Sequence, residues 1–214
     1  MFWEKTLFEA VSPINGKIKV SEKNGQRKLT VDGYTQSVSL NRDGLTGKHY
    51  WDIFTDGSIR LDQDSRVLVL GLGGGTIPKI LTRKFGLVII DGVEVDPLIV
   101  EIAKNYFGLN EPNINIFTED AARFVKNAKY KYDLICVDIY NGGEMASICS
   151  DNSFFEDCKK IMSEKGVLGV NKIIDSSYDL KNYLDFLRGF FKSVQYFVNT
   201  KNLNHTNAII YCRS

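Results

Sequence analysis

The feature that most constrains this chain is a run of four apolar residues that leads into four glycines within five positions, Val67-Leu-Val-Leu-Gly-Leu-Gly-Gly-Gly75. An amphipathic segment follows the run. A strand, a tight glycine turn and a helix form the opening unit of nucleotide-binding α/β folds. Glycine tolerates positive φ and lets a ligand approach the main chain. Gly71, Gly73 and Gly75 therefore predict a nucleoside site, although a tight turn without a ligand has the same pattern.

Around and after this turn, strand-like and helix-like segments alternate. Each strand-like segment is short and almost continuously apolar, which is typical of a parallel sheet covered on both faces. We expect strands at 66–71, 87–94, 113–117, 132–138 and 166–172. We expect helices at 75–85, 97–107, 119–127, 153–163 and 178–190.

The last two strand-like segments, Ser193–Asn199 and Asn207–Cys212, have only a polar loop between them. This spacing excludes a helical crossover and predicts an antiparallel hairpin at the sheet edge. Five strand–helix units closed by such a hairpin predict an α/β fold with a doubly wound, mostly parallel, seven-stranded sheet of the class I methyltransferase-like Rossmann type. A dinucleotide-binding Rossmann fold would instead need a sixth parallel strand with its own helix.

The N-terminal part of the chain follows a different pattern, that of a small antiparallel β-meander. We expect three strands at Gly16–Glu22, Arg27–Val31 and Tyr34–Val38, with turns at Asn24-Gly25 and Asp32-Gly33. A sheet of this size has a weak core of its own. We therefore expect it to pack on the main domain or on a second subunit, and the second arrangement predicts a homodimer.

A short segment then connects the meander to the glycine turn. Tyr50–Phe54 is expected to be helical, with Trp51 and Phe54 as its docking face, and Asp56-Gly-Ser58 is expected to be a linker. The chain is therefore divided into residues 1–58, the N-terminal meander and linking helix, and residues 59–214, the nucleoside-binding domain.

Charge and composition limit the partners of the chain. Lys+Arg number 27 and Asp+Glu 26, a formal charge of +1, so no overall attraction to nucleic acid or to a membrane is expected. The first residues lack the apolar segment of a signal peptide. The cysteines form no CxxC pair and only two histidines accompany them, so no metal site is expected. Cys136 and Cys212 lie in apolar runs and are expected to be buried thiols of a cytoplasmic protein.

Glu94 lies at the end of the second expected strand, about twenty residues after Gly71. At this separation an acidic side chain meets the ribose of a bound nucleotide in folds of this kind. One carboxylate can accept hydrogen bonds from both ribose hydroxyls, and it would repel the 2′-phosphate of NADP. Asp96 stands directly before Pro97, and this pair is expected to cap the next helix instead.

Two further strand ends carry acidic residues. Asp120 follows the third strand, where its carboxylate can accept a hydrogen bond from an adenine amino group, with the N–H of Ala121 facing a ring nitrogen; capping the next helix is the alternative role. The fourth strand ends at Asp138. Because the carboxyl ends of parallel strands meet at one edge of the sheet, the residues that follow are expected beside the reacting group. The polar candidates in that loop are Tyr140, Asn141 and Glu144.

The sequence resembles the spermidine synthase family of polyamine aminopropyltransferases over most of its length. The segments that carry the resemblance are Leu29–Gln36, His49–Asp52, the glycine turn, Val93–Asp96, Glu119–Ala121 and Tyr132–Asp138. The most diagnostic of them is the meander with its terminal Gly33-Tyr-Thr-Gln36, because generic methyltransferases rarely carry such a hairpin before their first Rossmann strand.

The resemblance implies a transferase whose co-substrate is decarboxylated S-adenosylmethionine and whose acceptor is a diamine such as putrescine. Residues that match Gln36, Glu94 and Asp120 hold the nucleoside in that family. The expected nucleoside-binding residues are Gln36, Gly71, Gly73, Gly75, Glu94, Val95, Asp120, Ala121 and Asp138. The expected catalytic residues are Asp138, Tyr140 and Asn141, and the expected substrate-binding residues are Tyr50 and Glu144.

Three positions depart from the family pattern. Gly74 stands where the glycine turn of the family usually carries an aspartate, and Trp51 stands where the family usually carries a glutamine. Asn141 replaces the aspartate that is credited with taking the proton from the attacking amine, and asparagine cannot act as that base. Asparagine also lacks the negative charge that a diammonium substrate requires in a partly desolvated pocket.

Three functions therefore stay open. The first is aminopropyl transfer to a polyamine-type amine, with Asp138 or Glu144 in place of the missing acid. The second is methyl transfer from S-adenosylmethionine to an unknown substrate, because Asp138-Ile-Tyr140 distantly resembles the Asp-Pro-Pro-Tyr loop of amino-methylating enzymes. The third is a catalytically degenerate homologue that only binds a nucleoside. Each predicts a small-molecule nucleoside as partner, and the first adds an amine.

Overall fold

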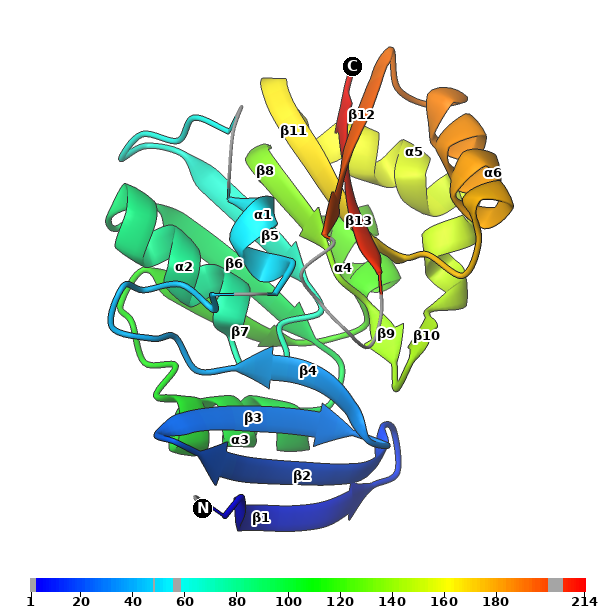
Figure 1. The fold of residues 1–214 in the computed structure, drawn as a ribbon. Helices are drawn as coiled ribbons and strands as arrows, with labels where there is room; N and C mark the ends of the chain where they lie inside the picture. The colour runs from blue at the N-terminus through cyan, green and yellow to red at the C-terminus, as the bar shows by residue number, and fades with distance from the viewer. Residues whose placement is uncertain (1–2, 48, 56–58, 200–205) are drawn as a thin grey trace.

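The computed structural model describes residues 3–47, 49–55, 59–199 and 206–214 (Figure 1). Its largest sheet has seven strands in the order β12-β13-β11-β8-β5-β6-β7. These strands are β5 (Arg66–Leu70), β6 (Ile89–Glu94), β7 (Ile114–Thr118), β8 (Tyr132–Val137), β11 (Met162–Ile173), β12 (Ser193–Asn199) and β13 (Asn207–Arg213). β13 runs antiparallel to both of its neighbours, and the other pairs are parallel. The predicted doubly wound, mostly parallel sheet is confirmed.

Helices cover both faces of this sheet, which explains why its strands are almost continuously apolar. The main helices are α2 (Thr76–Phe85), α3 (Pro97–Phe107), α4 (Ala121–Asn127), α5 (Asn152–Ile161) and α6 (Ser177–Arg188). In β5, Leu68 and Leu70 pack into the core formed with α4, α5 and α6. Val67 and Val69 point to the opposite face and pack against α2 and α1 (Trp51–Phe54). The two-residue period of the strand therefore buries apolar side chains on both sides.

The predicted C-terminal hairpin is confirmed, and its register fixes the end of the sheet. β12 and β13 pair antiparallel from Ser193 with Arg213 to Asn199 with Asn207. β13 also pairs with β11, where Asn171 lies opposite Ile209. The hairpin therefore inserts its second strand next to the parallel sheet and leaves β12 at the edge.

The N-terminal sheet has four strands, so the prediction of three was wrong. β1 (Lys5–Ser12) pairs antiparallel with β2 (Gly16–Lys23), followed by β3 (Gln26–Val31) and β4 (Tyr34–Val38). β1 is an edge strand whose side chains are mostly exposed or only partly buried. Its sequence therefore lacks the strict alternation that identified the other three strands.

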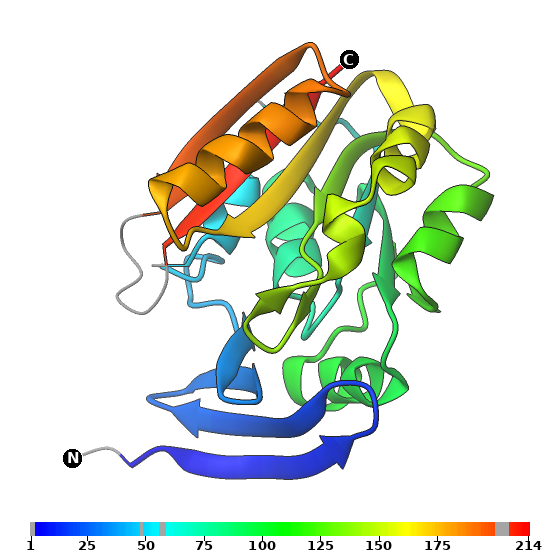
Figure 2. The ribbon, with the colours of Figure 1, turned by 90° about the vertical axis from the view of Figure 1, so that its right-hand side faces the viewer.

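The meander obtains its core from the main domain. Ile18, Val20, Leu29 and Val31 are buried in one cluster with Ile99, Ile102 and Phe107 of α3. Both ribbon views show α3 lying along the meander (Figures 1 and 2). The expectation that the meander packs on the main domain is thus confirmed, while the homodimer stays a prediction.

Asp96, at the start of α3, connects the meander with the main domain. Its carboxylate accepts the N–H of Leu98 at 2.9 Å, as expected of a helix cap. It also accepts hydrogen bonds from the Ser12 hydroxyl and, at 2.9 Å, from the Asn15 amide. The turn between β1 and β2 is therefore fixed to the end of β6.

The short helix α1 docks as expected, with Trp51 at 2% and Phe54 at 0% exposure. The expected linker at residues 56–58 lies outside the described residues, and the domain division at residue 58 stays a prediction. The four cysteines are buried free thiols. Within the described ranges, no helix combines the length and the apolar character needed to cross a membrane.

Candidate active site

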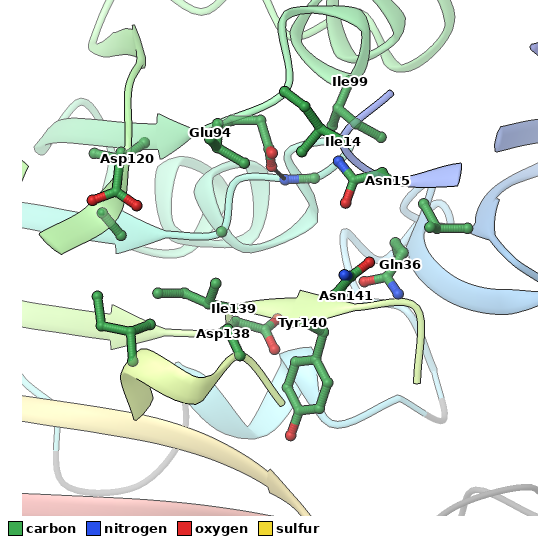
Figure 3. A pocket seen from close by; sticks show the side chains of 18 of the residues that line it. Ile14, Asn15, Gln36, Glu94, Ile99, Asp120, Asp138, Ile139, Tyr140 and Asn141 are labelled. Atoms are coloured by element: carbon green, nitrogen blue, oxygen red, sulfur yellow. Dashed lines mark hydrogen bonds between the residues drawn. The ribbon is translucent and has the colours of Figure 1, made fainter. Parts of the chain in front are cut away.

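A cavity of about 330 Å³ lies at the carboxyl ends of β5, β6 and β8, on the side where the meander approaches. This volume lies in the range of small-molecule and cofactor sites. Of the residues singled out in the sequence, the cavity is lined by Gln36, Gly71, Gly73, Glu94, Val95, Asp120, Ala121, Asp138, Tyr140 and Asn141. Figure 3 shows Glu94 and Asp138 on opposite sides of the cavity, with Asp120 toward one end and Gln36 toward the other.

The glycine turn brings the main chain to the cavity wall. Gly71, Gly73 and Gly75 all have positive φ, at 85°, 51° and 83°. A Cβ on Gly71 would lie 2.1 Å from the carbonyl oxygen of Asp138, so β5 and β8 can meet here only without a side chain. Gly75 caps α2 and packs against Leu109 rather than lining the cavity.

Gly74 is enclosed by the last strand of the meander. Its N–H donates to the Ser37 hydroxyl at 2.7 Å. A Cβ at this position would lie 2.8 Å from the Cβ of Ser37 and 3.2 Å from the Phe107 ring. The space that a side chain would need at position 74 is therefore already filled by Ser37, which accounts physically for the glycine.

Glu94 is held against the glycine turn by backbone donors. Its carboxylate accepts the N–H of Gly73 at 3.0 Å and the N–H of Asp96 at 3.2 Å. The side chain is buried, and burial raises the pKa of Glu94 above the usual range, although these hydrogen bonds oppose the shift. The next residue, Val95, is 44% exposed and forms part of the cavity wall.

Asp120 caps the helix that follows it and also lines the cavity. One carboxylate oxygen accepts the N–H of Arg123 at 2.9 Å and caps α4. The same residue and Ala121 line the cavity at the end of β7. A capping bond uses part of the acceptor capacity of a carboxylate and leaves the remaining lone pairs for a ligand.

Asp138 is the centre of a hydrogen-bond network. The Tyr50 hydroxyl contacts both carboxylate oxygens, at 2.9 and 3.1 Å. The Asn171 amide donates at 2.8 Å and the Trp51 indole N–H at 3.3 Å. Burial raises the pKa of Asp138 to about 6, and the hydrogen bonds from Asn171, Tyr50 and Trp51 oppose that rise. At neutral pH the group is ionised but close to titrating.

The loop after β8 folds into a small hairpin of β9 (Tyr140–Asn141) and β10 (Glu144–Met145). The Tyr140 hydroxyl donates to the carbonyl of Asn171 at 3.1 Å and accepts the N–H of Ile173 at 2.9 Å, so it is engaged by β11. Asn141 is exposed and lines the cavity. Glu144 is exposed and lines neither this cavity nor the second one described next.

A second cavity of about 120 Å³ adjoins the first and shares Gln36 and Tyr140 with it. Gln36 lies at the boundary between the two cavities. Its side-chain amide donates to the carbonyl of Gly142 at 2.7 Å, which connects β4 to the β9–β10 hairpin. The other residues that line the second cavity are Gly33, Tyr34, Thr35, His49, Tyr50, Trp51, Gly142, Asn171, Ile173 and Asn207. Tyr50 thus lies in its wall and reaches Asp138 in the first cavity.

Several lining residues were not anticipated from the sequence. Ile14 and Asn15, in the turn between β1 and β2, reach the first cavity because Asp96 holds that turn in place. Asn171 and Asn207 line the second cavity, and the Asn207 amide donates to the side-chain oxygen of Asn171 at 2.9 Å. A sequence signal existed only for Asn171, a polar residue directly after the apolar run Val167-Leu-Gly-Val170.

Comparison with known proteins gives a consistent family match. The family model described as the spermine/spermidine synthase domain matches residues 55–212. A probable polyamine aminopropyl transferase of Bifidobacterium longum is 30% identical over 173 residues, which cover 79% of this chain and 38% of the relative. A polyamine aminopropyltransferase of Vibrio vulnificus is 34% identical over 119 residues, covering 53% and 40%. The chain thus spans less than half the length of these curated relatives.

Solved structures agree on the fold. The spermidine synthase of Thermotoga maritima superposes with a TM-score of 0.76 at 20% identity, covering 97% of this chain and 72% of that one. Human methyltransferase-like protein 13 in complex with SAH gives a TM-score of 0.61 at 25% identity, covering 70% and 72%. The same seven-stranded architecture therefore occurs in both kinds of protein.

Proposed function

This chain belongs to the spermine/spermidine synthase domain family, and from that premise we propose that it transfers the aminopropyl group of decarboxylated S-adenosylmethionine to an amine of the polyamine type. The observation that carries the proposal is the grouping of Glu94, Asp120 and Asp138 around one cavity at the ends of successive strands. Their negative charges complement a donor that carries a sulfonium and an ammonium group.

In the proposed complex, the nucleoside lies along the row of strand ends. Glu94, oriented by the N–H groups of Gly73 and Asp96, accepts hydrogen bonds from the two ribose hydroxyls. Asp120 accepts from the adenine amino group, and Ala121 donates its N–H to a ring nitrogen. Asp138 then lies beside the sulfonium end, next to the second cavity.

The reaction needs positioning of two partners and removal of one proton. The lone pair of a neutral amine forms a C–N bond to the methylene carbon next to the sulfonium, the electrons of the broken C–S bond go to sulfur, and methylthioadenosine leaves. We assign the proton of the product ammonium to Asp138 through Tyr50, which faces the second cavity and is hydrogen-bonded to both carboxylate oxygens. Glu144, the other acid considered, lines neither cavity.

Methyl transfer from S-adenosylmethionine is the second candidate function. The observation that favours it is the contact of Gly74 with Ser37. It excludes an acidic side chain at the position where the family usually has one, so the cavity lacks a negative charge that would repel the carboxylate of S-adenosylmethionine. A binding homologue without activity is the third candidate.

Calorimetric titration with decarboxylated S-adenosylmethionine, S-adenosylmethionine and methylthioadenosine separates these functions. Preference for the decarboxylated donor, with release of methylthioadenosine when an amine is added, supports the proposal. Preference for the carboxylated donor supports methyl transfer. Binding of methylthioadenosine without turnover of either donor leaves the binding homologue, and no heat with any of them contradicts all three.

The cellular location, the type of partner and the oligomeric state are also part of the proposal. The balanced charge of the chain and its four unpaired thiols support a cytoplasmic enzyme that acts on small molecules rather than on nucleic acid or membranes. A homodimer is proposed from the small N-terminal sheet, and sedimentation velocity at micromolar concentration tests it.

A further inference from the structure

The second cavity differs from the first in its charge. Among the described residues that line it, none is Asp, Glu, Lys or Arg. Lys48 and residues 200–205, next to His49 and Asn207 in the sequence, contain no acidic residue either. Burial lowers the pKa of His49, although Asp52 opposes this, so the imidazole is mostly neutral near pH 7. The walls therefore offer amide, hydroxyl and aromatic groups, but no negative charge.

The acidic side chains nearest to this cavity already accept hydrogen bonds from other groups of the protein. The carboxylate of Asp138 is surrounded by the Tyr50, Trp51 and Asn171 donors on the side of the second cavity. Asp32 follows β3, but its carboxylate accepts the N–H of Lys17 at 2.9 Å and so faces the β1–β2 turn.

Two further acids lie in neighbouring segments and are not among the described lining residues, although the charge of one of them, Asp175, contributes to raising the pKa of Tyr140. Asp175, just beyond β11, is exposed, and so is Glu144 on β10. Neither of them lines the second cavity. Asn141, at the position where the family usually has an acid, is uncharged as well.

An acceptor with two amino groups requires more than this cavity provides. The attacking nitrogen must lose its proton before it reacts, but the distal nitrogen stays protonated at pH 7, like a lysine side chain. A cation that enters a partly desolvated site loses its hydration water, and an acidic partner compensates for that loss more fully than neutral amides or aromatic rings do. Here the partners would be neutral amides and aromatic rings.

We propose that the acceptor is an amine with a single positive charge in solution, whose far end is uncharged and lies in the second cavity. This inference rests on the proposed transfer reaction and narrows its acceptor. The second cavity has a volume of about 120 Å³, against about 330 Å³ for the first, so it takes a short chain. Tyr34, Tyr50 and Trp51 supply apolar surface for that chain, and the Asn207 side chain supplies a polar contact for a hydroxyl or amide at its end.

The test compares three acceptors that share a four-carbon chain: 1,4-diaminobutane, its N-acetyl derivative and butylamine. The full chain is assayed for methylthioadenosine release with saturating decarboxylated S-adenosylmethionine. We expect kcat/KM for at least one singly charged amine to exceed that for the diamine at least tenfold. An equal or higher value for the diamine would overturn the proposal.

A binding measurement separates this inference from the transfer function. If no acceptor supports release, the proposed function fails, and the amines are titrated calorimetrically into protein saturated with methylthioadenosine, or into the protein alone if methylthioadenosine does not bind. At least tenfold tighter binding of a singly charged amine would still support the charge preference of the cavity. Tighter or equal binding of the diamine, or no binding of any amine, would overturn it.

A charge added to the wall gives a matched pair of variants. Thr35 is an exposed residue of β4 that lines the second cavity and lies outside the Asp138 network. We expect Thr35→Glu to raise the preference for diaminobutane over its N-acetyl derivative at least tenfold relative to Thr35→Gln, which has the same length without the charge. The same preference in both variants, with native circular dichroism, would show that the acceptor does not occupy this cavity.

Discussion

The two cavities are built on different principles. The first lies where parallel strands end, and Glu94, Asp120 and Asp138 reach it from three successive strands. The second is assembled from β4, the segment around α1, the β9–β10 hairpin and the ends of β11 and β13, and its described lining residues carry no acidic group. Acidic side chains thus line the cavity where a cationic donor would bind, whereas none of the described residues that line the acceptor cavity is acidic.

Under the proposed function, this difference separates the residues that would hold the nucleoside from those that would select the acceptor. The acids of the first cavity are fixed by the sheet itself, because each one ends a strand or starts a helix. The second cavity depends on contacts between distant segments, such as Gln36 with Gly142. A departure from the family pattern there, such as Trp51, changes the wall of the second cavity and leaves the strand ends that carry Glu94, Asp120 and Asp138 in place.

The largest expected effect comes from Asp138, where the two cavities meet. Asp138→Asn removes the proposed base and should lower kcat by about 10²–10⁴-fold, with an unchanged circular dichroism spectrum. Glu144→Gln removes the alternative acid and should leave kcat within about twofold, because Glu144 lies outside both cavities. Loss of activity in Glu144→Gln but not in Asp138→Asn would reverse the assignment of the base.

Glu94 tests whether the first cavity alone binds the nucleoside. Glu94→Ala should weaken methylthioadenosine binding by about 1.5–3 kcal/mol, the usual range for hydrogen bonds to a charged group. The affinity for a singly charged amine should stay the same, since Glu94 does not line the second cavity. Calorimetry measures both constants, and an unchanged nucleoside affinity would remove Glu94 from the site.

The raised pKa of Asp138 predicts a pH dependence of stability. A carboxyl whose pKa rises on folding binds its proton more tightly in the folded state, so its favourable contribution is present below about pH 4 and is lost as the pH rises through about 6. The full loss amounts to about 3 kcal/mol, at 1.36 kcal/mol per pKa unit. Urea unfolding at pH 4 and pH 7 should show this difference between the wild type and Asp138→Asn; parallel pH profiles would contradict it.

The smallest expected effect concerns the fit of the meander on the glycine turn. Gly74→Asp places a side chain against Ser37 and should lower the free energy of unfolding by about 1–2 kcal/mol through overpacking. Ser37→Gly in the same chain should recover part of this loss by opening the space. Equal stability of wild type and Gly74→Asp would show that β4 moves away easily, and that another reason keeps glycine here.

Much of the fold could be predicted from the sequence because its signals are local. The apolar strands, the Asp96-Pro97 cap and the final hairpin each follow from a few neighbouring residues. The first meander strand was missed because Lys5–Ser12 is an edge strand with little burial. The position of Glu94 and Asp120 in the cavity wall could be predicted because residues at the ends of parallel strands lie at the carboxyl edge of the sheet.

The second cavity could not be predicted for the opposite reason. Asn171 and Asn207 approach one another only because β11 and β13 pair antiparallel in one particular register. A catalytic role is predicted for Tyr140, and its hydroxyl is already bonded to β11. It donates to the carbonyl of Asn171 and accepts the N–H of Ile173. The sequence gives residue types at such positions, and only the pairing of distant strands determines their partners.

The hydrogen bonds of Asp96 have a consequence for the apo protein. Asp96 holds Asn15, which lines the first cavity, and its own N–H orients Glu94. A ligand that binds only while this turn is docked stabilises the docked state in proportion to the logarithm of its concentration. The N-terminal sheet is thereby linked thermodynamically to a site built by the other sheet, and amide exchange along β1 and β2 becomes a readout of nucleoside occupancy.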